Sequence, residues 1–199
     1  MAEIEYFFSV ISSYTYLAGQ RPAEIAARHG LGVVYRPLDI TALFERTGGV
    51  AVGARHASRQ AYRLRDLARQ ARRAGLPINL QPAFFPANAA PASYAIIAAQ
   101  AAGGGDMAAL VHGLSRACWA EDRNVADDAV IRAALSGAGF DPSLAAKGLF
   151  TGADAYTKNL EAAVAAGVFG APSWVTPDGE LFWGQDRLAD LEAHLAEGV

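Results

Sequence analysis

The sequence predicts an α/β fold in which a β-α-β unit and an α-β-β-α unit are separated by a helical insertion. Two strand-like runs, residues 4–8 and 32–37, flank a helix-like segment near the N-terminus. Residues from about 40 to 153 then carry almost only helical patterns. Near the C-terminus, two short strand-like runs flank Thr176-Pro177-Asp178-Gly179, which is a strong turn signal.

The β-α-β unit begins with residues 4–8, whose aromatic and β-branched side chains are typical of a buried strand. The segment from Thr15 to Gly30 is predicted to be one helix, because its apolar residues can share a face and Gly30 supplies a C-terminal stop. Residues 32–37 form the second strand, which ends at a proline. The crossover between such strands is right-handed, so we expect the two strands to be parallel.

The insertion is predicted to contain several helices. Apolar residues recur at helical spacing between Tyr62 and Ala71, and Gly75-Leu76-Pro77 ends this element. Further helices are expected at residues 89–102, 106–121, 127–137 and 142–149. We therefore expect residues 40–153 to form a helical insertion domain, and residues 1–39 and 154–199 to form the other domain.

The α-β-β-α unit is predicted to start at Asp154, a residue type that suits a helix N-cap, and its first helix should run to Ala166. A hairpin over residues 173–183 and a final helix over residues 186–197 complete it. The order of elements is that of a thioredoxin-like β-α-β/α-β-β-α domain with a helical insertion in the middle.

Composition restricts the possible partners and compartments. The 199 residues are 52% hydrophobic, which is ample for a sizeable core. A net charge of −3 argues against nucleic acid as a partner, and no apolar run approaches the roughly 20 residues needed to span a membrane. The start of the chain lacks signal-peptide features, and its one cysteine, Cys118, cannot form an internal disulfide. We expect a cytoplasmic protein in which Cys118 is a small buried apolar residue.

Two distant segments predict a functional site. Ser12 follows the first strand at a helix start, where free backbone N–H groups favour an anion, although Ser12, Ser13 and Thr15 are equally suited to be plain N-caps. Pro172 precedes the third strand, where an X-Pro bond is expected to be cis and to expose the backbone of Ala171 to an extended ligand. An ordinary proline at a strand edge is the alternative. Because serines stand at the first turn, any thiol chemistry must come with a ligand.

A third candidate segment is Phe182-Trp183-Gly184-Gln185-Asp186-Arg187-Leu188. Asp186 stands at a predicted helix start, where it caps its own helix or meets the ammonium group of a γ-glutamyl ligand. Arg187 is equally suited to a structural salt bridge and to a ligand contact.

Taken together, the motifs resemble those of 2-hydroxychromene-2-carboxylate isomerases and of kappa-class glutathione transferases. The resemblance covers nearly the whole chain. It rests on the order and spacing of Ser12-Ser13-Tyr14-Thr15-Tyr16-Leu17-Ala18, Arg59-Gln60-Ala61-Tyr62 with Asp66-Leu67, Phe85-Pro86-Ala87-Asn88, Ala117-Cys118-Trp119, Val168-Phe169-Gly170-Ala171-Pro172 and Trp183-Gly184-Gln185-Asp186-Arg187-Leu188.

The resemblance implies that glutathione is the cofactor and that no metal is needed. By position, Ser12 would contact the glutathione sulfur, and Ala171, which precedes the cis-proline Pro172, would bond the cysteinyl backbone. Asp186, with Gln185 and Arg187, would contact the γ-glutamyl end of glutathione. Arg59 would bind its glycyl carboxylate; the alternative is that Arg59 is an ordinary solvent-exposed arginine on a helix. An aromatic substrate would meet an apolar wall, for which the candidates, each also suited to the core or to structure, are Tyr14, Phe84, Phe85, Asn88 and Trp183. A homodimer is also implied.

Two positions differ from the family pattern. Ser13 stands where the family usually has proline, and the residues after Asn88 include none of the basic side chains that some isomerases carry there. The resemblance therefore names no basic residue in that segment for the carboxylate of an aromatic substrate.

Three functions remain open on the sequence. The first is a glutathione-dependent isomerase that interconverts 2-hydroxychromene-2-carboxylate and trans-o-hydroxybenzylidenepyruvate through transient addition of a thiolate. The second is a kappa-like glutathione transferase or peroxidase. The third is a non-catalytic thioredoxin-like module that binds a peptide along the backbone before Pro172. A disulfide oxidoreductase is excluded because the chain has one cysteine.

Overall fold

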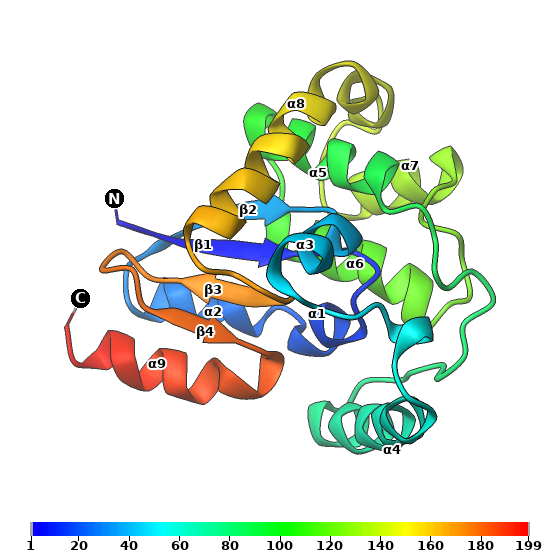
Figure 1. Cartoon of the computed structure of the whole chain (residues 1–199). Coiled ribbons are helices and arrows are strands. Elements are labelled where there is room, and N and C mark those ends of the chain that lie inside the picture. The colour runs from blue at the N-terminus through cyan, green and yellow to red at the C-terminus, as the bar shows by residue number, and fades with distance from the viewer. Residues whose placement is uncertain (1, 199) are drawn as a thin grey trace.

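The computed structural model describes residues 2–198, and at its centre lies a four-stranded mixed sheet (Figure 1). The strands are β1 (Glu3–Phe8), β2 (Gly32–Pro37), β3 (Ser173–Val175) and β4 (Leu181–Trp183), in the order β2-β1-β3-β4. β1 and β2 are parallel, with Glu3 opposite Gly32, whereas β3 is antiparallel to both β1 and β4. The predicted fold class, the parallel first pair and the C-terminal hairpin are confirmed.

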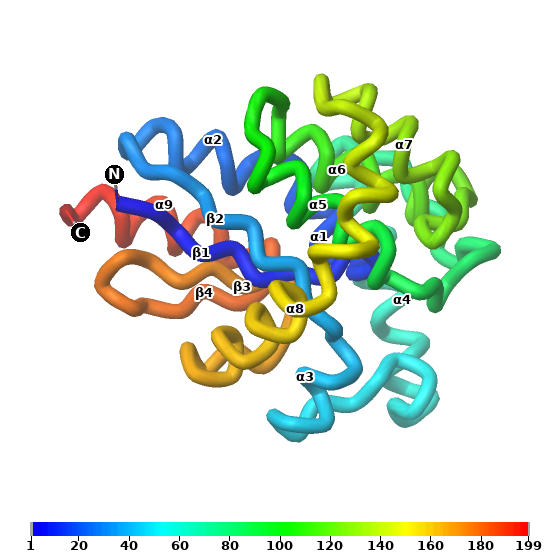
Figure 2. Tube along the Cα trace, turned by 90° about the horizontal axis from the view of Figure 1, so that it is seen from above, coloured from blue at the N-terminus to red at the C-terminus, as the bar shows by residue number. Residues whose placement is uncertain are grey.

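The helices cover both faces of this sheet and build the insertion. In both views α4 lies at the end of the molecule away from the two termini (Figures 1 and 2). The helices are α1 (Ser13–Ala18), α2 (Arg21–Arg28), α3 (Ile40–Thr47), α4 (Ala57–Ala74), α5 (Ala90–Ala102), α6 (Met107–Trp119), α7 (Asp128–Gly137), α8 (Leu144–Ala165) and α9 (Leu188–Ala196), with 3-10 turns η1 (Val52–Ala54) and η2 (Gln185–Arg187).

Alternation along β1 divides the core between the two faces of the sheet. Ile4, Tyr6 and Phe8 belong to a large cluster that α1, α2, α5, α6 and α9 complete. Phe7 points to the opposite face, where it joins a smaller cluster that includes Leu43 of α3 and Ala163 of α8. This alternation has the period of two of a β-strand. One face of β1 is apolar, whereas the Phe7 face also carries the exposed Glu3 and the half-buried Glu5.

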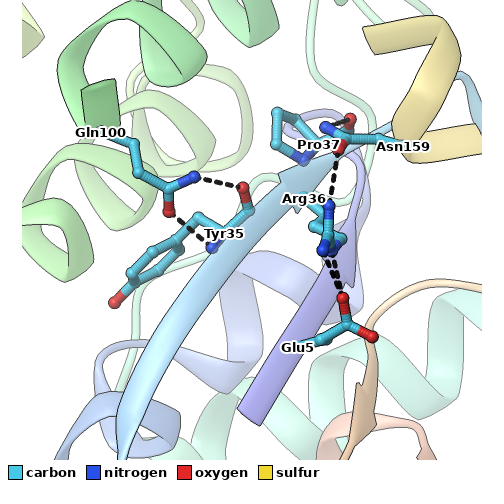
Figure 3. A network of polar contacts seen from close by, with 6 residues as sticks. All are labelled: Glu5, Tyr35, Arg36, Pro37, Gln100 and Asn159. Atoms are coloured by element: carbon cyan, nitrogen blue, oxygen red, sulfur yellow. Dashed lines mark hydrogen bonds and ion pairs between the residues drawn. The ribbon is translucent and has the colours of Figure 1, made fainter. Parts of the chain in front are cut away.

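The edge strand β2 is covered by side chains of the helices that flank it (Figure 3). Gln100 of α5 accepts a hydrogen bond from the Tyr35 N–H at 2.7 Å and donates one to the Tyr35 carbonyl at 3.1 Å, as a neighbouring strand would. On the other side, Asn159 of α8 donates to the Pro37 carbonyl at 3.0 Å, and Arg36 forms an ion pair with Glu5. The Gln100 and Asn159 contacts satisfy backbone groups that an exposed edge would leave free for another chain.

The single helix expected from Thr15 to Gly30 is wrong. The chain breaks at Gly19, whose φ of 63° lies in the left-handed region, and it restarts as α2 with Pro22 in the first turn. Arg21 then donates hydrogen bonds to the carbonyls of Leu17 and Ala18, which the end of α1 leaves free. Glycine tolerates this conformation and proline suits a helix start, so two short helices replace one.

The separate helices expected at 142–149 and from Asp154 are also wrong, because α8 is continuous. Asp154 lies inside it and forms an exposed ion pair with Lys158 at 2.7 Å, so it caps nothing. Gly148 and Gly152 do not end a helix. A Cβ on Gly148 would stand 2.6 Å from the Tyr94 carbonyl oxygen, so these glycines allow α5 and α8 to pack closely. The expected boundary before residue 154 falls within α8.

The other elements follow the sequence closely. α4 ends at Gly75, which adopts the left-handed conformation of a C-terminal stop. The final helix begins with η2, so Asp186 lies in a 3-10 turn and does not cap α9. Within residues 2–198, no helix combines the length and the apolar character needed to cross a membrane.

Candidate active site

Ser12 lies in the turn that connects β1 to α1. It is the N-cap residue of α1, and its Oγ accepts a hydrogen bond from the Thr15 N–H at 3.3 Å. The same hydroxyl donates to the carbonyl of Ala171 at 3.3 Å. The structure thus brings together the two segments that the sequence singled out, although 159 positions separate these residues.

The segment around Ala171 offers backbone groups to a ligand. The Ala171–Pro172 bond is cis, as expected. Pro172 is buried, and its carbonyl accepts a hydrogen bond from the Gly184 N–H at 2.9 Å. Within residues 2–198 the Ala171 N–H has no hydrogen-bond partner. An unpaired N–H and a weakly bonded carbonyl are what an extended peptide needs to pair with.

A cleft with three compartments opens beside Ser12, and Tyr14 and Arg55 line all three. The apolar compartment has a volume of about 370 Å³ and contains Ser12. Its walls are Ile11, Ser12, Ser13, Tyr14, Ile40, Thr41, Phe44, Ala51, Val52, Gly53, Arg55, Arg63, Phe85, Pro86 and Ala171. This volume falls in the range of about 300–1,000 Å³ that is usual for small-molecule sites.

The second compartment, here called the turn compartment, has a volume of about 600 Å³ and shares Ala171 with the first. It is polar at the end formed by η2. Its walls are Tyr14, Phe44, Arg55, Tyr62, Asp66, Gln70, Gly170, Ala171, Trp183, Gly184, Gln185, Asp186 and Arg187. Five residues that the family resemblance named therefore meet here: Gln185, Asp186 and Arg187 from one end of glutathione, and Tyr14 and Trp183 from the substrate wall.

The third compartment, here called the arginine compartment, has a volume of about 460 Å³ and holds Arg59. It is lined by Tyr14, Arg55, Ser58, Arg59, Tyr62 and Arg63. Arg59 is exposed and has no ion-pair partner within residues 2–198. Three arginines without an acidic residue on the wall make this compartment suited to a carboxylate.

At the turn compartment, the Arg187 guanidinium pairs with two carboxylates. Arg187 forms ion pairs with Asp186 at 3.1 Å and with Asp190 at 3.0 Å, and both acids raise the pKa of its guanidinium. The Asp186 side chain is 48% exposed, so its carboxylate keeps room for another cation. Gln185 is buried, and its Oε1 accepts a hydrogen bond from Arg21 at 3.3 Å.

Tyr14 stands where the three compartments meet. Its hydroxyl donates a hydrogen bond to Asp66 Oδ2 at 2.9 Å. Burial, together with the neighbouring Asp66 carboxylate, raises the pKa of Tyr14. The phenol therefore stays neutral at physiological pH, and Asp66 fixes its direction.

Arg63 is a site residue that the sequence reasoning missed. It is only 9% exposed, and its Nη2 donates to Ser13 Oγ at 2.9 Å. Its guanidinium lies 5.6 Å from the centre of the Phe85 ring and 5.4 Å from that of Trp119. Helical spacing could have indicated that Arg63 is buried, because positions 63, 67 and 71 share one face of α4 and Leu67 and Ala71 are buried apolar residues.

Two aromatic-wall candidates lie elsewhere. Asn88 is exposed and does not line the three compartments, and its Oδ1 accepts a hydrogen bond from the Ala90 N–H at the start of α5. Phe84 is also exposed and outside the three walls, whereas Phe85 packs on Trp119 and lines the apolar compartment. Trp183 lines the turn compartment and is 51% exposed.

Cys118 is buried in α6 and lines none of the three compartments. Burial raises the pKa of its thiol to about 12, so it carries almost no thiolate at neutral pH. The described residues, 2–198, include no group of three or more histidine, cysteine, aspartate or glutamate side chains arranged to hold a metal ion.

Comparison with known proteins shows the family of this chain. The sequence model of the DSBA-like thioredoxin domain matches residues 3–196. A protein named 2-hydroxychromene-2-carboxylate isomerase from Pseudomonas putida is 30% identical over 195 residues, which cover 96% of this chain and 92% of the relative. The chain belongs to the 2-hydroxychromene-2-carboxylate isomerase family of DSBA-like thioredoxin domains.

One further relative and two solved structures are also similar to this chain. A protein of the same name from Sphingobium xenophagum is 28% identical over 197 residues, 98% of each chain. A solved 2-hydroxychromene-2-carboxylate isomerase has a TM-score of 0.75 at 27% identity, covering 98% of this chain and 95% of its own. The cytosolic disulfide reductase DsbM from Pseudomonas aeruginosa, in a structure with GSH, has a TM-score of 0.71 at 19% identity, covers 98% of both chains and shows the fold alone.

Proposed function

We propose that the protein is a glutathione-dependent isomerase that acts on 2-hydroxychromene-2-carboxylate or a related intermediate of aromatic degradation. One observation carries this proposal. The Ser12 hydroxyl and the backbone of Ala171, whose N–H has no hydrogen-bond partner within residues 2–198, meet where an apolar compartment joins a polar one. A thiol bound there has a hydrogen-bond donor beside it and space for an aromatic molecule in front of it. The family relationship supports an isomerase.

The residues around the cleft fit glutathione, which is an extended peptide with charges at both ends. The Ala171 N–H and carbonyl suit its cysteinyl backbone, and the half-exposed Asp186 carboxylate suits its α-ammonium group. Arg59, which has no acidic partner among the described residues, suits its glycyl carboxylate. Gln185 and Arg187 complete the γ-glutamyl end of the turn compartment.

When bound, glutathione supplies a thiolate that adds reversibly to a conjugated double bond, which becomes single long enough to rotate. The task of Ser12 is to donate its hydroxyl hydrogen to the sulfur, which stabilises the charged form. A free cysteinyl thiol has a pKa of about 8.5 and is mostly protonated at neutral pH. Ser12 therefore acts as a donor and not as a nucleophile. Tyr14 and Phe85 hold the aromatic substrate and exclude water.

The proposal is tested by assaying the purified protein with 2-hydroxychromene-2-carboxylate, with and without glutathione. We expect its conversion to the benzylidenepyruvate, followed by ultraviolet absorbance, to be accelerated only when both protein and glutathione are present. The same preparations are tested with a standard electrophile for glutathione conjugation. Conjugation without isomerisation would identify a kappa-like transferase instead, and inactivity in both assays would leave the peptide-binding module.

Asp186→Asn is expected to weaken glutathione binding about tenfold, because a charge-assisted hydrogen bond to the ammonium group is lost from a half-exposed site. Isothermal titration calorimetry measures the change. Asp190→Asn is the matched control, since Asp190 also pairs with Arg187 but does not line the turn compartment. Equal affinities in wild type and Asp186→Asn would remove Asp186 from the glutathione site.

A further inference from the structure

The wall of the apolar compartment contains a buried cation. Arg63 is 9% exposed, and its guanidinium lies against the rings of Phe85 and Trp119, which pack on each other. Within residues 2–198, no carboxylate lies within ion-pair distance of it. Of its five N–H donors, one makes a hydrogen bond, from Nη2 to Ser13 Oγ.

A buried charge without a counter-ion costs free energy, because burial removes it from water. The two aromatic faces offset part of that cost through cation–π attraction. Burial also lowers the pKa of Arg63, although the guanidinium remains charged. The other N–H groups of Arg63 are available to bind an anion that enters the apolar compartment.

The surroundings favour an anion over a neutral ligand. Arg55 lines the same compartment, and no aspartate or glutamate does. The nearby Asp66 lines the turn compartment instead and already accepts hydrogen bonds from Tyr14 and Arg69. The rest of the wall is mostly apolar, including Ile11, Phe44 and Phe85. An anionic group on a flat apolar body matches this combination.

We propose that Arg63, held in place by Ser13 and assisted by Arg55, binds the carboxylate of a flat, apolar acid and so selects carboxylate substrates. Ser12 and Ser13 both line this compartment, so an acid bound by Arg63 shares it with the Ser12 hydroxyl. Arg55 and Arg63 line both the apolar and the arginine compartments, whereas Arg59 lines the arginine compartment but not the apolar one. The role of Arg63 in turnover rests on the proposed function, but its binding of the acid does not need glutathione.

Binding of trans-cinnamate and of its neutral analogue cinnamamide, measured by calorimetry without glutathione, tests the proposal. We expect the wild-type protein to bind cinnamate about tenfold or more tightly than cinnamamide, which is the worth of a charge-assisted hydrogen bond. Arg63→Met should abolish this preference, Arg63→Lys should keep a reduced one, and the matched control Arg59→Gln should retain it in full. Circular dichroism establishes that each variant is folded.

Several results would overturn the proposal. They are equal affinities of the wild type for the two ligands, no measurable binding of cinnamate, a preference that survives in Arg63→Met, or its loss in Arg59→Gln. If Arg63→Met does not fold, the wild-type comparison and Arg63→Lys decide. An unreduced preference in Arg63→Lys would then contradict recognition of the carboxylate by the Arg63 guanidinium. A preference for cinnamate in a protein without isomerase activity would reject the proposed function while supporting the acid site.

Discussion

Replacing Ser12 with alanine is expected to raise the pKa of bound glutathione by about one to two units and to slow turnover about 10- to 100-fold. A hydrogen bond to a charged group is worth about 1.5–3 kcal/mol, and one pKa unit corresponds to about 1.4 kcal/mol. The Ser12 hydroxyl donates to the Ala171 carbonyl, at a long 3.3 Å, so it is able to turn to a thiolate. Below the raised pKa the thiol stays protonated, and the loss of activity should therefore be greatest near neutral pH.

Titration of the thiolate absorbance in the glutathione complex measures this shift. Ser9→Ala is the matched control, because Ser9 is buried nearby in the same turn and its hydroxyl has no hydrogen-bond partner within residues 2–198. An unchanged titration in Ser12→Ala would show that another hydroxyl stabilises the thiolate. Ser13 would then be the next candidate.

Trp119→Ala is expected to lower the free energy of unfolding by about 3–5 kcal/mol, the usual cost of removing a large buried aromatic side chain. Trp119 is fully buried at the end of α6. Its ring packs on Phe85 at 4.8 Å between centres and lies below the Arg63 guanidinium, and its Nε1–H donates to the Ile11 carbonyl at 3.2 Å. One side chain therefore supports both the core and the wall of the apolar compartment.

Thermal unfolding followed by circular dichroism checks this expectation, and we expect the midpoint to fall by about 10 °C or more. Trp183→Ala is the control, since Trp183 is half exposed and its loss should change the free energy of unfolding by much less. Trp119→Phe should cost less than Trp119→Ala, because it keeps an aromatic partner for Phe85. Equal midpoints for Trp119→Ala and Trp183→Ala would contradict the structural role given to Trp119.

Local patterns were sufficient to predict most elements and the centre of the candidate site. The strands of the sheet are short apolar runs bounded by turn residues, and the hairpin is marked by Thr176-Pro177-Asp178-Gly179. Ser12 and Ala171 were predicted to meet because each occupies a recognisable turn beside a strand. The antiparallel pairing of β1 and β3 places both turns at the same end of the sheet. The predicted strand order and the turn residues were thus enough to predict a contact between residues far apart in the sequence.

Tertiary contacts decided what those patterns left ambiguous. The sequence predicted two helices, at 142–149 and from Asp154, but α8 is continuous, and its glycines at 148 and 152 allow the close contact with Tyr94. By itself, the sequence determined the thioredoxin-like order of elements, the turn at Ser12 and the X-Pro turn, because these depend on residues adjacent in the chain. Only the tertiary structure decided that Arg63 is a buried cation beside Ser13, because its burial depends on rings contributed by Phe85 and Trp119 from distant segments.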